Sequence, residues 1–198
     1  MKLIGKNSAS TFLCWLFFGF FVLTTLHLLY EIIAHSILFY KFKTGIQIFS
    51  ETFILGNDVG WAKNKWTIPM NEQLKFKINY PFSNTQLVTG LYEPFQIFFN
   101  LIAFIFFSAF FYFSYKSFKE MSCDRIFNSN AIKWLKRLAF VSIFFSIISI
   151  IPHIIFYKMT SFAFLQFFFI GFFGIIILFI VEFFKKGYAL QSENDLTI

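Results

Sequence analysis

Apolar residues in this chain are gathered into four long runs, separated by stretches that carry most of the charge. The runs cover residues 12–33, 95–115, 138–156 and 162–184. Each is close to the length of about 20 residues that a helix needs to cross the hydrocarbon core of a bilayer. The last run has no charge before Glu182, and the helix of the earliest run is predicted to continue toward Tyr40. The pattern predicts four transmembrane helices.

Composition agrees with this pattern, because 58% of the 198 residues are hydrophobic and only 14% are charged. Soluble domains average about 45–50% apolar and about 25% charged residues. We therefore predict an all-α membrane fold, a four-transmembrane-helix bundle that forms a single membrane domain over residues 1–198. The lipid bilayer is its expected surrounding, and a homo-oligomer is an open alternative to a monomer.

The distribution of Lys and Arg predicts the orientation. The N-terminus, the connection 116–137 and the boundary at Lys185 and Lys186 together hold ten of the 17 basic residues. Lys and Arg in short connections mark the cytoplasmic side of a membrane protein. We therefore expect both termini in the cytoplasm, with the chain in the inner membrane of a bacterial cell. Since the net charge of +7 is explained by topology, we expect no direct contact with nucleic acid.

The segment 41–93 is the only large polar connection, and it is predicted to lie outside the cytoplasm. Residues 74–80 alternate between apolar and polar side chains, which is typical of a strand. Residues 47–55 and 61–68 are weaker strand candidates, and residues 56–58 and 81–84 have turn composition. We predict a small β-rich segment between helices 1 and 2. It is too short to hold a core alone, so it should lean on the helix ends or the lipid surface.

His27, Glu31 and His35 recur at every fourth residue and share one helix face. Two imidazoles and a carboxylate could bind a metal or relay protons, or serve a local structural or sensing role. A solvated position near the outer interface is the simplest interpretation, with Glu31 meeting water or a lysine of the outer segment. We therefore keep these residues as a polar site and predict no tight metal site.

Two further patterns concern packing and catalysis. Gly171 and Gly174 are three residues apart in the last apolar run, where small side chains allow helices to approach closely. The chain has no Gly-rich phosphate loop, no Gly-x-Ser-x-Gly turn and no His-Glu-x-x-His motif. We therefore expect a protein that is not an enzyme, with no catalytic residues and no cofactor.

The C-terminal tail, residues 185–198, carries the most specific sequence signal. It begins with Lys185-Lys186-Gly187 and ends with Glu193-Asn194-Asp195-Leu196-Thr197-Ile198, with Leu190 between them. This ending resembles that of the bacterial membrane family called domain of unknown function 2975. Members share the length, four spans, an extended segment between the leading two spans and this C-terminal pattern. The resemblance defines no catalytic residues for the family.

The resemblance implies a partner, because such proteins are often encoded beside a small helix-turn-helix regulator. It suggests a membrane component that regulates or anchors this cytosolic protein. Leu196 and Ile198 are apolar without a local reason, so we predict that they bind the partner, with Glu193 and Asp195 setting orientation. A solvated stub is the alternative for the tail. For the whole chain, a small oligomeric transporter or channel-like protein and an envelope structural or stress protein stay open.

Overall fold

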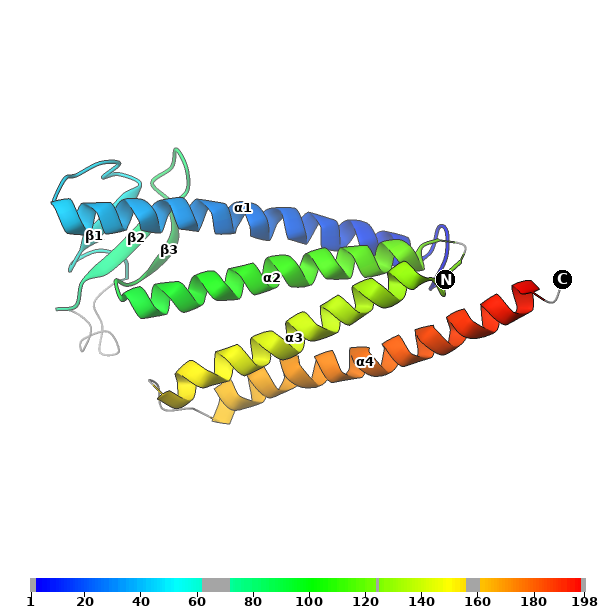
Figure 1. The fold of residues 1–198 in the computed structure, drawn as a ribbon. Helices are drawn as coiled ribbons and strands as arrows, with labels where there is room; N and C mark the ends of the chain where they lie inside the picture. Colours follow the sequence, from blue (N-terminus) through cyan, green and yellow to red (C-terminus); the bar gives the residue numbers. More distant parts are fainter. Residues whose placement is uncertain (1–2, 62–71, 124, 156–160, 197–198) are drawn as a thin grey trace. The chain divides into compact units, whose positions relative to one another are not determined.

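The computed structural model describes residues 3–61, 72–123, 125–155 and 161–196. These residues form four long helices and a three-stranded sheet (Figure 1). Each helix is long and apolar enough to cross a membrane, which confirms the prediction of four such helices and of a small β-rich insert. In chain order the elements are α1 (Ala9–Thr44), β1 (Phe53–Gly56), β2 (Lys75–Asn79), β3 (Gln86–Leu91), α2 (Pro94–Met121), α3 (Ser129–Ile155) and α4 (Ser161–Leu196).

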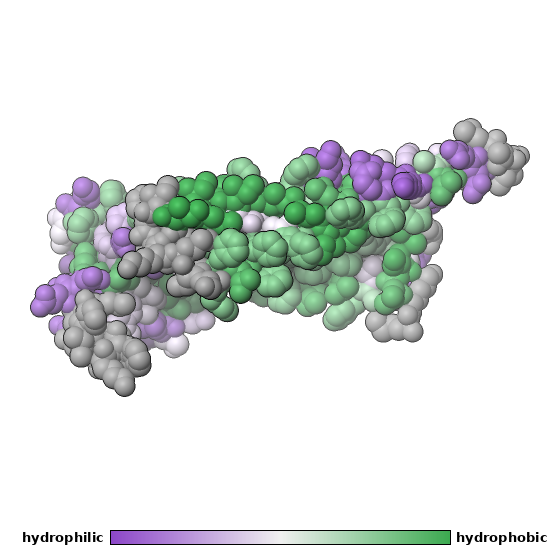
Figure 2. Space-filling view, turned by 90° about the horizontal axis from the view of Figure 1, so that it is seen from below, coloured by the Kyte–Doolittle hydropathy of each residue, from purple (hydrophilic) through white to green (hydrophobic). Residues whose placement is uncertain are grey.

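The chain divides into two compact units, which we describe separately. The helical unit contains Met1–Thr25 and Ala103–Ile198, and the sheet unit contains Leu26–Ile102. Helices α1 and α2 therefore contribute to both units. Apolar side chains cover much of the helix surface, whereas hydrophilic ones gather toward the C-terminal end of α4 (Figure 2). Large side chains such as Phe144 and Phe179 point outward with 65% and 66% of their surface exposed.

In the helical unit, α3 and α4 pack closely because small residues line their contact. A Cβ atom added at Gly174 would lie 2.7 Å from Ile143 Cγ1 and 2.8 Å from the Ala139 carbonyl oxygen. At Gly171 it would lie 2.8 Å from Ser146 Oγ. The two glycines therefore permit the close approach that their spacing predicts. The core between these helices consists of Ala131, Leu135, Leu138, Ala139, Ile177, Val181 and Phe184.

In the sheet unit, the three strands are antiparallel and lie in the order β1-β2-β3. This sheet packs against the C-terminal half of α1. Tyr30 Oη donates a hydrogen bond to the Asn79 carbonyl oxygen at 2.6 Å, and Lys41 Nζ donates one to the Phe53 carbonyl oxygen at 2.6 Å. The insert therefore leans on a helix, as expected. Its buried core consists of Ala34, Leu38, Phe53, Phe76, Ile78 and Ile97.

The strand predictions had mixed outcomes. The strand predicted at 74–80 is β2, and the turns expected at 56–58 and 81–84 lie where turns or bends are found. Only the end of the candidate 47–55 is a strand, β1. Most of the candidate 61–68 lies outside the described residues. Strand β3 was not predicted from the sequence.

The helix ends differ most from the sequence prediction. Helix α3 begins at Ser129, where Asn128 Oδ1 accepts a hydrogen bond from the Ala131 backbone N–H at 2.8 Å. Such an N-cap stabilises the start of a helix. The connection between α2 and α3 is therefore residues 122–128, shorter than the predicted 116–137. The tail is no irregular segment, because α4 continues as a helix to Leu196.

Candidate functional site

The C-terminal extension of α4, residues 185–196, continues the helix beyond its apolar part. Lys185 Nζ lies 2.6 Å from Glu182 Oε1, and both side chains are exposed. At about 1.5 Å per residue, the 36 residues of α4 reach roughly 54 Å, well beyond a hydrocarbon core of about 30 Å. The extension exposes Tyr188 and Leu190, at 46% and 62%. It therefore presents apolar side chains on a mostly polar helix.

One aromatic ring joins this extension to the connection between α2 and α3. A Cβ atom added at Gly187 would lie 2.7–2.8 Å from three atoms of the Phe127 ring. The same ring meets Phe184 edge-on, with centroids 5.3 Å apart. Phe127 therefore packs on the α4 backbone at Gly187, where no side chain intervenes. This contact holds the base of the extension against the 122–128 connection.

A groove of about 240 Å³ lies next to this contact, and we call it the loop–extension groove. Its polar groups come from both elements: a guanidinium, two amides and three hydroxyl groups can donate or accept hydrogen bonds. Such a surface can form hydrogen bonds with a polar peptide segment. It is lined by Arg125, Phe127, Asn128, Ser129, Tyr188, Gln191 and Ser192.

The predicted tail residues lie just beyond this groove. Glu193 is exposed on the helix, and Asp195 and Leu196 belong to its last turn. Ile198 lies outside the described residues. The sequence argument missed Phe127, and it named Gly187 only as part of the tail pattern, not as a contact position. Its available signal was a glycine that directly follows two lysines, a position where a helix-favouring residue would be expected.

The second candidate, His27, Glu31 and His35, is only partly assembled. His27 Nε2 and Glu31 Oε1 are 3.0 Å apart, so these two side chains form a hydrogen-bonded pair. Glu31 is only 2% exposed. Our expectation of a solvated Glu31, meeting water or a lysine, is therefore wrong. A buried carboxylate needs a partner because its desolvation is costly, and His27 provides it.

His35 lies apart from that pair. Its ring meets Phe76 of β2 edge-on at 4.9 Å, and its buried Nδ1 has no hydrogen-bond partner in the described part of the chain. Within the described ranges, no three His, Cys, Asp or Glu side chains are grouped to hold a metal ion. The spacing therefore brings two of the three residues together, and the third packs against the sheet.

Comparison with known protein families identifies one match for this chain. The family described as "Protein of unknown function (DUF2975)" matches residues 62–198, well over half of the chain. The chain belongs to this family. No curated protein and no solved structure matches it. The resemblance predicted from the C-terminal pattern is thus confirmed.

The part of this chain that matches the family contains Phe127, Gly187 and the whole extension. His27, Glu31 and His35 precede the matched part. The residues that line the loop–extension groove lie within the matched range, whereas the histidine–glutamate pair lies before it. We take the groove and the extension as the candidate functional site.

Proposed function

We propose that this protein is a non-enzymatic, multi-pass protein of the inner membrane that anchors a small cytosolic helix-turn-helix regulator. The observation that carries the proposal is the α4 extension, a polar helix that continues the last apolar segment and is held at its base by Phe127. A helix held in this way can present side chains to a partner at a fixed height above the bilayer.

The distribution of basic residues supports a cytoplasmic position for the extension. Lys116, Lys119, Lys133 and Lys136 lie near the same connection that Phe127 joins to α4, and Lys185 and Lys186 begin the extension. Under the positive-inside rule all of these belong on the cytoplasmic side. The extension would then enter the compartment where DNA-binding regulators work.

The chemistry of the extension supports a protein partner. Short peptide segments bind through a few apolar anchors together with charged groups. Leu190 and Leu196 supply apolar anchors, with Ile198 beyond them, and Glu193 supplies charge. The loop–extension groove offers a second, polar contact region next to the same helix.

Deletion of residues 193–198 tests the proposal. Because the extension's contact with Phe127 lies at Gly187, the truncated protein should insert normally and unfold in detergent at nearly the same temperature. Binding to the purified helix-turn-helix protein encoded beside its gene should be lost. We would measure binding by pull-down of the detergent-solubilised protein.

Point variants test whether binding needs the apolar side chains of the tail or only its full length. The double variant L196A/I198A should lose binding, whereas T197A, which changes the residue between them, should retain it. If the truncated protein binds the regulator as well as the full chain does, the anchoring proposal is wrong. If truncation instead causes misfolding, the tail has a structural role in the membrane domain.

A further inference from the structure

A group of cations surrounds one tryptophan where α2 and α3 lie side by side in the helical unit. Lys116 Nζ, Lys133 Nζ and the Arg137 guanidinium lie 5.6, 5.7 and 4.7 Å from the centre of the Trp134 ring. We call these four residues the Trp134 cluster. None of its three cations forms an ion pair with a carboxylate of the described residues. The cluster therefore carries three positive charges that make no direct ion pair within the part of the chain that the structure describes.

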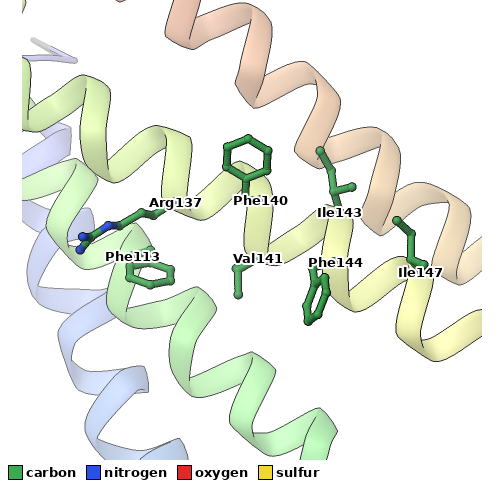
Figure 3. Close-up of a pocket in the computed structure, with 7 residues that line it drawn as sticks. All are labelled: Phe113, Arg137, Phe140, Val141, Ile143, Phe144 and Ile147. Atoms are coloured by element: carbon green, nitrogen blue, oxygen red, sulfur yellow. The ribbon is translucent and has the colours of Figure 1, made fainter.

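An apolar groove of about 460 Å³ begins at this cluster. Arg137 lies at one end, and Phe113 of α2 forms part of the wall (Figure 3). From there the groove follows α3 past Phe140 and Phe144 to Ile147. Phe140, Phe144 and Ile147 are each at least half exposed. Among the described residues that line the groove, Arg137 is the only charged one.

The length of the groove matches half of a bilayer. Arg137 and Ile147 are ten residues apart on one helix, which corresponds to about 15 Å at 1.5 Å per residue. Half of a hydrocarbon core of about 30 Å is the same distance. Arg137 also directly precedes the apolar run 138–156. In a bilayer that α3 crosses, the charged end of the groove would thus lie at the depth of lipid headgroups, and its apolar end would lie near the midplane.

We infer that this groove is a binding site for an anionic phospholipid. The phosphate lies against Arg137, Lys116 and Lys133, and one acyl chain fills the groove toward Ile147. The inference rests on the membrane position in our proposed function, but not on the cytosolic partner. Arginine binds phosphate through paired N–H groups, and basic pockets between membrane helices hold anionic headgroups.

The charge pattern favours an anionic lipid over the other candidate occupants. A zwitterionic headgroup would bring its own cation close to the three cations of the Trp134 cluster, which is unfavourable. In a twofold-symmetric contact, a second copy of this chain would bring its own Trp134 cluster against this one, and like charges facing each other are unfavourable. Only an anionic headgroup complements the charged end while its acyl chain complements the apolar end.

Fluorescence quenching of Trp134 tests this site. The variant W15F/W61F/W66F keeps Trp134 as the only tryptophan, and circular dichroism checks that it folds. The protein is reconstituted into phosphatidylcholine vesicles that contain either brominated phosphatidylglycerol or brominated phosphatidylcholine. We expect brominated phosphatidylglycerol to quench Trp134 with an apparent association constant at least about fivefold higher, since one cation near a charged surface contributes about that factor.

Two variants that remove the same amount of charge test which residues cause the preference for phosphatidylglycerol. K133Q/R137Q should abolish it, whereas K185Q/K186Q, which removes the same charge from the α4 boundary, should retain it. Equal quenching by the two lipids, or an equal loss in both variants, would overturn the lipid site while leaving the membrane position intact. Absence of quenching by either lipid would overturn the site and the membrane position together.

Cross-linking between copies through a cysteine at Phe144, with Trp134 shielded from both lipids, would identify a second copy as the occupant and refute the inference.

Discussion

At the scale of single residues, the contact between Phe127 and Gly187 determines how the C-terminal extension is held. A glycine inside a helix normally costs stability, by up to about 1 kcal/mol relative to alanine. Here the missing side chain leaves room for an aromatic ring at 2.7–2.8 Å from the position a Cβ would occupy. The glycine therefore exchanges helix propensity for a tertiary contact between two distant parts of the sequence.

This exchange predicts that the two positions are energetically coupled. In an F127A background, G187A should raise the unfolding midpoint in detergent, because only the gain in helix propensity remains. In the native background, the new methyl group must displace the Phe127 ring, so the same change should lower the midpoint. Thermal unfolding of the four proteins of this double-mutant cycle measures the coupling. Equal effects of G187A in both backgrounds would show that the ring does not hold the extension.

The sequence anticipated some residues of the candidate sites but not their surroundings. The four-residue spacing of His27 and Glu31 was enough to predict that they share a helix face, and they do pair. Their burial was not predictable, because it depends on what packs around α1. For the same reason nothing in the sequence could place Phe127 on Gly187, since 60 residues separate them and the contact depends on the packing of α3 and α4.

At the scale of secondary-structure elements, the α3–α4 pair depends on Gly174. The atoms that a Cβ there would meet include the Ala139 carbonyl oxygen, which belongs to a helix backbone and cannot rotate away. Overpacking a tight contact of this kind costs about 1–3 kcal/mol. Of the two glycines at this contact, Gly174 is thus the one whose replacement would press on a helix backbone.

Gly19 provides a matched control for this contact. It also lies within a helix of the helical unit, but a Cβ there would meet nothing within 4 Å. We expect G174A to lower the unfolding midpoint in detergent, and G19A to leave it unchanged or raise it slightly through helix propensity. If the two variants shift the midpoint equally, the close contact between α3 and α4 contributes nothing to stability.

Apolar runs predicted the middle of each helix well and its ends poorly. Polar residues such as Lys133 and Lys136 belong to α3, yet they are invisible to an argument based on hydrophobicity. Strand β3 was missed because Gln86–Leu91 contains Gly90 and lacks strict alternation. The reason for a glycine at this position is visible only in the folded sheet, where the Phe76 ring lies 3.0 Å from the position that a Cβ of residue 90 would occupy.

At the scale of the whole molecule, our account assigns the two ends of the helices to different compartments. The sheet unit contains a folded insert, whereas the connection between α2 and α3 is short and flanked by basic residues. The proposed anchoring of a regulator requires that the connection and the α4 extension lie in the cytoplasm, whereas the proposed lipid site requires only that the helices span the membrane. Topology is therefore the central claim.

Labelling of cysteines in intact cells tests this claim most directly. Cys123 is exposed in the 122–128 connection and serves as the inner probe in a C14S background. Asn57, which is exposed in the sheet unit, serves as the outer probe as N57C in a C14S/C123S background. We predict that a membrane-impermeant maleimide labels N57C in intact cells and labels Cys123 only after the cells are permeabilised. Labelling of Cys123 but not N57C in intact cells would reverse the orientation and contradict the account.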